Sequence, residues 1–414
     1  MNILVIIGSD LNLNSSANLC HIAYLNGFDL NKDKLTVLTV EHENSLNENT
    51  MLPSKNVNYI FYKKGNFIDH LSAFVKNTFF KSNASDVVYQ KDYKVKKEGN
   101  VNTKESFLKN IKKLLMNDIY YVEWSWIKRA SKFKSKEVYD VVISLSTPHS
   151  SHKVACNLIE KKHINYKRYV QIWEDPWTGD LFFNQENRAK FENEENSLLS
   201  YATDIYYVSP VTYEYQKKKF YNFSNKMKWM PLPYYYVDDH DQNFSQCNFG
   251  YFGDFYPHVR NIEPLYNSFV SLKYPLVICG NPEGYLKSND NISIYGRMPV
   301  EELKKYEDNT NVLVFVCNLY GGQIPGKIYQ YSGTKKKILF ILDGKKEEIK
   351  QIKDYFERFN RYYFCENNEE SISNAINRIV ENNDNVSSEI IEYFSPKKIV
   401  NNILHGKNES DSKE

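Results

Sequence analysis

Short apolar segments that alternate with helical segments constrain the fold of this chain more than any other feature. Residues 2–8 (NILVIIG) form a continuous apolar run that ends in glycine, as expected of a strand buried on both faces of a parallel sheet. A helical segment at 15–27 and apolar runs at 34–40 and 57–62 follow it. A strand, a helix and a second strand joined by short turns predict a doubly wound α/β domain.

The alternation starts a second time after an interruption at residues 230–233 (MPLP), which contains two prolines. Further strands on the two sides of this interruption are predicted at 139–145, 169–173, 204–208, 247–252, 276–279, 292–295, 312–316 and 337–342. A chain of 414 residues is long enough to bury two or three cores of ordinary size. The pattern therefore predicts two Rossmann-like α/β domains joined by a linker.

The predicted domain boundaries follow from the position of this linker. The first domain is expected at 1–232, with a basic insertion at about 81–136 where the apolar periodicity is weak. The second domain is expected at 245–386, and a terminal helix at 387–404. The remaining residues, 405–414, are polar and are expected to be disordered.

Charge and cysteine content argue against several classes of function. The chain has 53 Lys and Arg against 51 Asp and Glu, and this near-neutral balance argues against a nucleic-acid partner. The six cysteines are scattered without a Cys-x-x-Cys pair, which favours buried thiols in a reducing cytoplasm over disulfides or a zinc site. No apolar run reaches the length of about 18 residues that a membrane span needs. We therefore expect a cytoplasmic protein.

The segment 91–140 is basic within this near-neutral chain, with 13 Lys and Arg against 7 Asp and Glu. It contains a predicted amphipathic helix at 105–122, with Trp124 and Trp126 close behind. A basic amphipathic surface with tryptophans suits the face of an anionic membrane. Two interpretations follow: peripheral membrane contact through 91–136, or a solvated helix that packs by its apolar face.

Glycines and basic side chains follow the predicted strands of the second half. A glycine lets the backbone approach a ligand, and a helix N-terminus supplies free N–H groups for an anion. The residues concerned are Gly253, Asp254, Arg260, Gly280, Asn281, Gly296, Arg297, Gly321, Gly322 and Lys327. Together they predict a diphosphate site, and so a nucleotide derivative. The alternative is a set of ordinary turn glycines with a surface Arg and Lys.

Polar and aromatic side chains follow two predicted strands of the first half. His149 and His152 come after one strand, and Glu174, Asp175 and Trp177 come after the next. Imidazole and carboxylate groups at neighbouring strand ends can orient a hydroxyl acceptor. The alternative places Trp177 in core packing and His152 in the first turn of a helix.

Four short motifs occur in an order and spacing that resemble one enzyme family. Residues 146–152 (STPHSSH) precede 173–178 (WEDPWT), while 251–254 (YFGD) and 324–331 (IPGKIYQY) lie in the second half. These segments resemble those of bacterial family 4 glycosyltransferases. The resemblance implies a GT-B fold, in which two Rossmann-like domains face a central cleft and the last helix crosses back to the first domain.

The resemblance also implies an activity. Such enzymes transfer a sugar from a nucleoside-diphosphate donor to a hydroxyl acceptor, here a glycan or a lipid-linked acceptor, usually with retention of configuration and without a divalent metal. Bacterial surface polysaccharide assembly is the expected setting. Fixed positive groups lower the barrier by stabilising the charge that develops on the leaving diphosphate.

The expected site residues fall into three groups. The catalytic group comprises Arg260, Lys327, Glu174 and Asp175. The donor-binding group comprises Gly8, Ser9, Gly253, Asp254, Gly280, Asn281, Gly296, Arg297, Gly321, Gly322 and Gln330. The acceptor-side group comprises His149, His152 and Trp177. No metal ligands and no cofactor are expected.

Some positions depart from the family pattern. Asp254 stands where the family commonly has an Arg, and Gln330 stands where it has a ribose-binding Glu. Gln330 can still bind a ribose diol, without the help of a charge. Two alternatives stay open: a non-catalytic relative that binds nucleotide sugar or a partner enzyme, and a nucleotide-sugar epimerase of the same fold. No G-x-G-x-x-G follows Gly8, which argues against a nicotinamide dehydrogenase.

Overall fold

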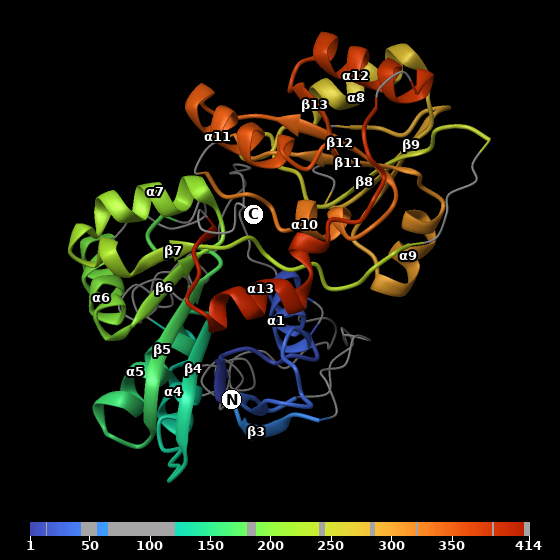
Figure 1. Cartoon of the computed structure of the whole chain (residues 1–414). Coiled ribbons are helices and arrows are strands. Elements are labelled where there is room, and N and C mark those ends of the chain that lie inside the picture. The colour runs from blue at the N-terminus through green and yellow to red at the C-terminus, as the bar shows by residue number, and fades with distance from the viewer. Residues whose placement is uncertain are drawn as a thin grey trace, which may run out of the picture.

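Two parallel sheets, one in each half of the chain, organise the structure, which is a computed structural model (Figure 1). Two parallel-sheet α/β domains, the predicted fold class, are therefore confirmed. The structure describes residues 1–13, 15–42, 56–64, 121–179, 188–239, 245–281, 286–319, 322–382 and 385–409.

The sheet of the first domain has the strand order β3-β2-β1-β4-β5-β6-β7, with all neighbours parallel. Its strands are β1 (Asn2–Ile7), β2 (Lys34–Val40), β3 (Asn58–Tyr62), β4 (Val138–Ser146), β5 (Asn165–Trp173), β6 (Asp204–Tyr207) and β7 (Met227–Trp229). The strand order reverses direction at β1 and β4, and ligands of such sheets bind at the carboxyl ends of the strands beside such a point.

The sheet of the second domain has the order β10-β9-β8-β11-β12-β13 and is also parallel throughout. Its strands are β8 (Phe249–Phe252), β9 (Leu276–Cys279), β10 (Ile292–Tyr295), β11 (Val312–Val316), β12 (Lys337–Leu342) and β13 (Tyr363–Glu366). The order reverses between β8 and β11, and Gly253 and Asp254 of the predicted diphosphate site directly follow β8.

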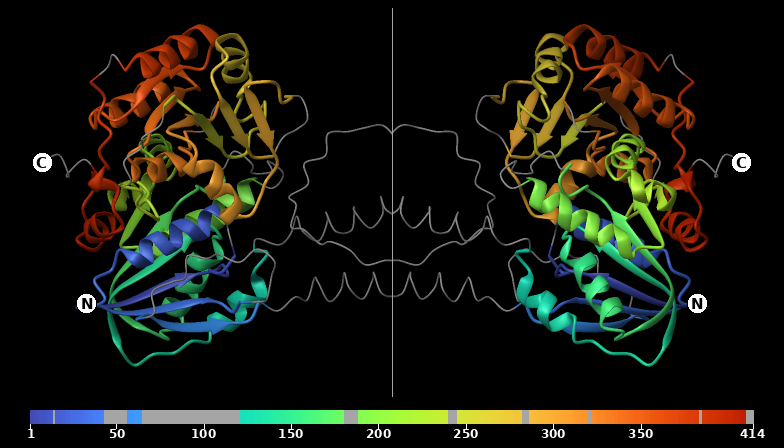
Figure 2. Two further views of the ribbon diagram at one scale, coloured as in Figure 1. Left: turned by 90° about the vertical axis from the view of Figure 1, so that its right-hand side faces the viewer. Right: turned by 90° about the vertical axis from the view of Figure 1, so that its left-hand side faces the viewer.

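Helices connect the strands in both domains (Figures 1 and 2). The first domain contains α1 (Ser16–Asn26), α4 (Trp124–Ala130), α5 (Ser150–Glu160), α6 (Arg188–Tyr201), α7 (Pro210–Lys219) and the short 3-10 helix η1 (Tyr221–Lys226). The second contains α8 (Glu263–Leu272), α9 (Val300–Asp308), α10 (Lys327–Ser332), α11 (Lys346–Glu357) and α12 (Glu369–Glu381). The 3-10 helix η2 (Glu392–Phe394) and α13 (Pro396–Leu404) follow.

Burial on both faces explains why the central strands are almost purely apolar. In β1, every residue from Ile3 to Ile7 is at most 1% exposed, because helices cover the sheet on both sides. β1 pairs with β4 in a register that places Ile3 beside Val141 and Ile7 beside Leu145.

Several elements differ from the sequence-based expectation. The strands β7 and β13 and the helices α6 and α11 were not predicted, because they are short or rich in charged residues. Within the predicted insertion at 81–136, α4 is part of the domain core: Trp126 is fully buried and its indole N–H donates to the Thr39 carbonyl at 3.3 Å. Residues 105–120 of the predicted helix at 105–122 and most of the basic segment lie outside the described residues, while Tyr121 and Val122 are described and are not helical.

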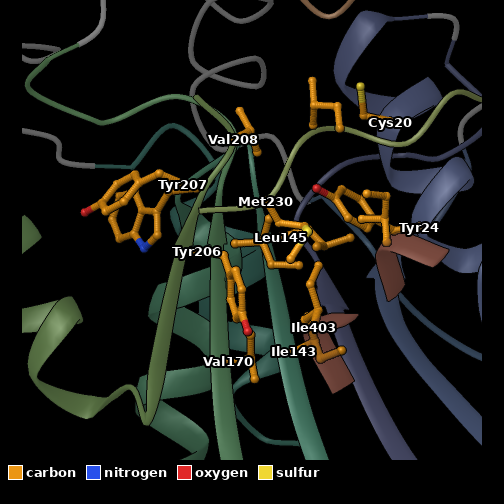
Figure 3. Close-up of a cluster of buried hydrophobic side chains, with 14 of the residues drawn as sticks. Cys20, Tyr24, Ile143, Leu145, Val170, Tyr206, Tyr207, Val208, Met230 and Ile403 are labelled. Atoms are coloured by element: carbon orange, nitrogen blue, oxygen red, sulfur yellow. The ribbon is translucent and has the colours of Figure 1, made fainter. Parts of the chain in front are cut away.

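The last helix returns to the first domain, as the resemblance implied. α13 packs against α1, and a Cβ on Gly27 would lie 2.3 Å from the Pro396 carbonyl oxygen, so this contact requires glycine. Ile403 of α13 shares a buried cluster with Tyr24, Ile143 and Leu145 (Figure 3). The predicted helix at 387–404 is shorter than expected, since α13 begins at Pro396 with Ser395 as its cap.

The expected disorder of 405–414 is wrong for residues 405–409. The Tyr206 hydroxyl donates to the Lys407 carbonyl at 2.8 Å in the first domain. Glu409 is 2% exposed and pairs with Arg358 of the second domain. This segment therefore contacts both domains, while 410–414 lie outside the described residues.

Candidate functional site

Arg260 lies at the carboxyl edge of the second sheet, where the predicted diphosphate site was placed. Its guanidinium donates to Asn318 Oδ1 at 2.8 and 3.2 Å and to the Asp254 carbonyl at 3.0 Å. Asn318 follows β11, and Asp254 follows β8. The cation is thus held in one orientation between the two strands that flank the reversal of the sheet.

The glycine turns around Arg260 include one close backbone approach. A Cβ on Gly280 would lie 2.1 Å from the Gly253 carbonyl oxygen, so the loops after β8 and β9 can meet only without a side chain there. Asn281 is exposed, and nothing lies within 4 Å of the Cβ position of Gly296. These positions border open surface.

Asp254, in the loop after β8, pairs with Arg297, in the loop after β10. The Arg297 Nε–H donates to Asp254 Oδ1 at 2.9 Å, and a second guanidinium N–H reaches Oδ2. The bond to Asp254 raises the pKa of Arg297. The Arg297 charge is thus compensated by Asp254, and Arg260 supplies the positive charge at this edge of the sheet.

Lys327 and Gln330, both on α10, have partners within the second domain and the linker. The Lys327 ammonium lies 3.6 Å from Glu307 Oε1. Gln330 is 2% exposed; its amide oxygen accepts N–H bonds from Tyr235 and Tyr236, and its amide group donates to the Tyr236 carbonyl at 3.2 Å. These bonds use both the oxygen and the nitrogen of the amide, so we do not include Gln330 among the proposed donor-binding residues.

The loop before α10 crosses to the first domain. Gly322 has φ +66°, and a Cβ there would lie 2.2 Å from Val211 Cγ1, so both its conformation and its packing on α7 require glycine. The Ser209 hydroxyl donates to the Gly322 carbonyl at 2.6 Å. Gly321 lies outside the described residues.

Gln323 completes a hydrogen-bond chain between the predicted catalytic residues of the two domains. Its side-chain amide donates to Asp175 Oδ1 at 2.8 Å, and its backbone carbonyl accepts from the Asn318 side-chain amide at 3.2 Å. The chain therefore runs Arg260–Asn318–Gln323–Asp175. Sequence analysis missed Asn318 and Gln323, although Gln323 stands within the glycine loop that it singled out.

Glu174 lies beside Asp175 at the carboxyl end of β5 and faces a histidine that sequence analysis also missed. Glu174 Oε1 is 3.4 Å from Nε2 of His21, which lies on α1 and is fully buried. Burial and the neighbouring Asp175 raise the pKa of Glu174 well above its usual range. Burial lowers the pKa of His21 to about 4.

Gly8 and Ser9 lie in the turn after β1, next to this pair. The Gly8 N–H donates to Ser151 Oγ at 2.8 Å, and a Cβ on Gly8 would lie 2.5 Å from Ser150 Oγ. The Ser9 hydroxyl lies 3.4 Å from His21 Nδ1. The turn therefore packs against the start of α5 and the His21 ring.

The acceptor-side residues divide into a core residue and a stacked pair. His152 is fully buried, with Nδ1 2.6 Å from Ser144 Oγ and its ring against Trp173, so it belongs to the packing alternative rather than to an acceptor site. His149 stacks on Trp177 at 4.8 Å between ring centroids and 10° between planes. The His149 Nε2–H donates to the Asp175 carbonyl at 3.3 Å, and burial lowers its pKa to about 4. The structure thus brings His149, Trp177 and Asp175 together.

Among the residues that the structure describes, no group of three or more His, Cys, Asp or Glu side chains is arranged to hold a metal ion. None of the helices in these ranges combines the length and the apolar character that a membrane span requires.

Comparisons with solved structures support the fold. The chain is similar to TarM, with a TM-score of 0.58 and 12% identity over 98% of each chain. It is similar to a sucrose-phosphate synthase from Thermosynechococcus elongatus, with a TM-score of 0.50, 12% identity, and 98% of this chain and 93% of that chain covered. A candidate UDP-N-acetylglucosamine 2-epimerase from Listeria monocytogenes gives a TM-score of 0.50 and 10% identity over 97% and 94% of the two chains. No protein-family model and no curated protein matches the sequence. At these identities the comparisons establish a GT-B-like fold.

Proposed function

We propose that this protein is a glycosyltransferase that moves a sugar from a nucleoside-diphosphate donor to a hydroxyl acceptor. The observation that carries the proposal is the chain Arg260–Asn318–Gln323–Asp175. It ties the predicted diphosphate-binding cation of one domain to the predicted acceptor-side carboxylate of the other, at the carboxyl edges of both sheets. The GT-B-like fold is consistent with this arrangement.

In this proposal Arg260 stabilises the charge on the leaving diphosphate. Its orientation is already fixed by Asn318 and the Asp254 carbonyl, so little reorganisation is needed as charge develops. Lys327 supplies a second positive group once it leaves Glu307. With these two cations in place we propose that transfer needs no divalent metal.

Asp175 orients the acceptor hydroxyl in the same scheme. Its carboxylate is held by Gln323, and its carbonyl accepts from the His149 ring that stacks on Trp177. The partly exposed ring of His149 beside a fixed carboxylate suits the apolar face and the hydroxyl of a sugar ring, while the buried Trp177 supports the His149 ring from behind. His149 and Asp175 are thus the proposed acceptor contacts, with Trp177 as the support of His149.

The first experiment measures nucleotide binding by thermal unfolding with UDP and GDP, with and without magnesium. A ligand that binds only the native state raises the unfolding midpoint. We expect a metal-independent rise with one of the two nucleotides. In Arg260→Ala we expect that rise to disappear and sugar transfer to fall by about a hundredfold, the loss expected for a fixed charge-stabilising donor.

Arg129→Ala provides the matched control, because Arg129 is exposed on α4 and donates to the Lys63 carbonyl at 3.1 Å, in the first domain. It should bind nucleotide like the wild type. Equal binding by Arg260→Ala and the wild type would contradict the diphosphate role of Arg260.

A nucleotide-sugar epimerase is the second candidate, because the Listeria protein and the sucrose-phosphate synthase are equally similar in TM-score. Incubation with UDP-N-acetylglucosamine and no acceptor separates the two functions. Interconversion of the free nucleotide sugar would favour the epimerase. Transfer that strictly requires an acceptor would favour the glycosyltransferase, and nucleotide binding without either reaction would favour a non-catalytic relative.

A further inference from the structure

Two buried polar atoms face each other at the domain junction without another partner. His21 Nε2 and Glu174 Oε1 lie 3.4 Å apart, and neither makes a hydrogen bond to any other described residue. The His21 side chain is fully buried and that of Glu174 is 8% exposed. Unpaired buried polar atoms cost free energy. One of these two atoms must therefore carry a proton and donate it to the other.

A hydrogen-bond chain from α1 indicates which nitrogen of His21 carries the proton. The Asn18 amide N–H groups donate to the carbonyls of Asp10 and Leu13 at 2.7 and 2.8 Å, which fixes Asn18 Oδ1 as an acceptor. The Ser9 hydroxyl donates to that oxygen at 2.6 Å. The Ser9 oxygen also lies 3.4 Å from His21 Nδ1. Because its only proton points to Asn18, the Ser9 oxygen can only accept from His21, which favours a proton on Nδ1.

A proton on Nδ1 leaves His21 Nε2 as an acceptor, because burial keeps the ring neutral. Glu174 Oε1 must then be the donor, which requires the carboxyl group to be protonated. Burial beside Cys20 and Tyr24 of α1 favours this neutral form, and it outweighs the Thr147 N–H at the end of β4, which donates to the carboxyl and favours the charged form. Asp175 adds a charge of the same sign, which disfavours a second carboxylate.

We propose that His21 is a positioning residue that holds Glu174 as a neutral, hydrogen-bond-donating carboxylic acid at the domain junction. This inference rests on the proposed function in one respect: a neutral Glu174 leaves Asp175 as the one carboxylate of this pair that carries charge near the incoming diphosphate. A nucleoside diphosphate is therefore admitted with less repulsion, and the second oxygen of Glu174 accepts a hydroxyl of the sugar.

Histidine ring nitrogen NMR of the full chain tests the proton positions without any substrate. The His21 signal is assigned by its loss in His21→Gln. We expect a protonated Nδ1 and a bare Nε2 at neutral pH. A protonated Nε2 would mean that His21 donates to a carboxylate or to the Ser146 carbonyl near the ring, and would overturn the proposal.

Unfolding free energy as a function of pH gives a second test that is independent of activity. A carboxyl whose folded pKa is raised loses stability as pH rises above its unfolded value of 4.5. Glu174→Gln keeps a neutral donor to His21 and cannot ionise, so its stability relative to wild type should grow as pH rises. A difference that is flat with pH would refute a protonated Glu174.

Glu195→Gln is the matched control for this substitution. Glu195 is also fully buried, but its oxygens accept from the Thr178 N–H, the Thr178 hydroxyl and the Gln216 amide. An amide there turns a donor toward donors, so Glu195→Gln should start out less stable than wild type, whereas Glu174→Gln keeps its hydrogen bond. Burial also raises the pKa of Glu195, so this deficit should narrow as pH rises.

The pH dependence of the affinity for UDP and GDP tests whether a neutral Glu174 reduces the repulsion of the incoming diphosphate. In wild type, nucleotide affinity should decrease as pH rises and Glu174 loses its proton. Glu174→Gln cannot ionise, so its affinity should not show this decrease. In His21→Ala the neutral carboxyl loses its acceptor, so the decrease should move to lower pH, which a purely structural defect would not cause. The same decrease of affinity with pH in both variants as in wild type would refute the effect of a neutral Glu174 on nucleotide binding. Absence of nucleotide binding in wild type would refute the proposed function, while the NMR and stability tests still decide the His21–Glu174 pair.

Discussion

Replacement of His149 by Gln tests whether the stacked pair at the junction is held neutral by burial. Burial lowers the pKa of His149 from 6.5 to about 4. Below pH 6.5 the unfolded chain takes up a proton at this position and the folded chain does not, so the stability that His149 contributes is fully present above 6.5 and is lost as pH falls toward 4. At pH 5 this linkage amounts to at most about 2 kcal/mol.

The readout is the gap in unfolding free energy between wild type and His149→Gln, measured with urea at pH 7.5 and at pH 5. The variant loses the stack on Trp177 and should be less stable by about 1 kcal/mol or more at pH 7.5. It does not titrate, so the gap should shrink by up to about 2 kcal/mol at pH 5. Other titrating groups contribute equally to both proteins, so their effect on stability cancels in this difference. Glu174 is one of them, and its raised pKa lowers stability as pH rises.

His405→Gln controls for the removal of a histidine as such, since His405 is exposed at the end of α13. A gap for His149→Gln that is equal at the two pH values would refute the argument. It would mean that His149 exchanges protons with solvent in the folded protein as freely as in the unfolded chain.

Substitutions at three further positions test the contacts between the domains. Gly322→Ala should destabilise by about 2 kcal/mol or more, because it combines a positive φ with a clash against Val211; chemical denaturation measures this. Gln323→Glu places a second carboxylate beside Asp175 and should separate the domains, seen as a larger radius of gyration by small-angle scattering, whereas Gln323→Met should change the radius less. Glu409→Ala leaves Arg358 without its carboxylate and should lower the unfolding midpoint; an unchanged midpoint would show that the terminal segment contributes no stability.

The sequence predicts the fold well because its strongest signals are physical necessities of that fold. Parallel strands buried on both faces must be apolar, and β1, β4 and β12 are recognisable for this reason. The helices α6 and α11 are harder to predict, since RAKFENEENSLLSY and KEEIKQIKDYFE carry many charges on exposed faces. The strand β7 has three residues and gives no periodic signal.

The candidate site is only partly predictable, because partners come from distant parts of the chain. Glu174 and Asp175 stand directly after β5, and Arg260 lies in the loop between β8 and α8, where ligand residues of parallel sheets are expected. His21 lies inside a helix with no motif around it, and only the fold brings it to Glu174. Gln330 occupies the position of a ribose-binding residue by resemblance, yet the linker backbone takes its amide, a contact that no local pattern reveals.

The position of α13 and of residues 405–409 has a consequence for the order in which the protein folds. Val400 and Ile403 cover Val5, Tyr24 and Ile143 in the first domain, and Arg168 of β5 donates to the carbonyls of Ile403 and Leu404 at 2.9 and 2.6 Å. The ribosome makes these residues only after the whole second domain. The first domain is therefore completed after the second, and until then the nascent chain exposes an apolar face that a chaperone can bind.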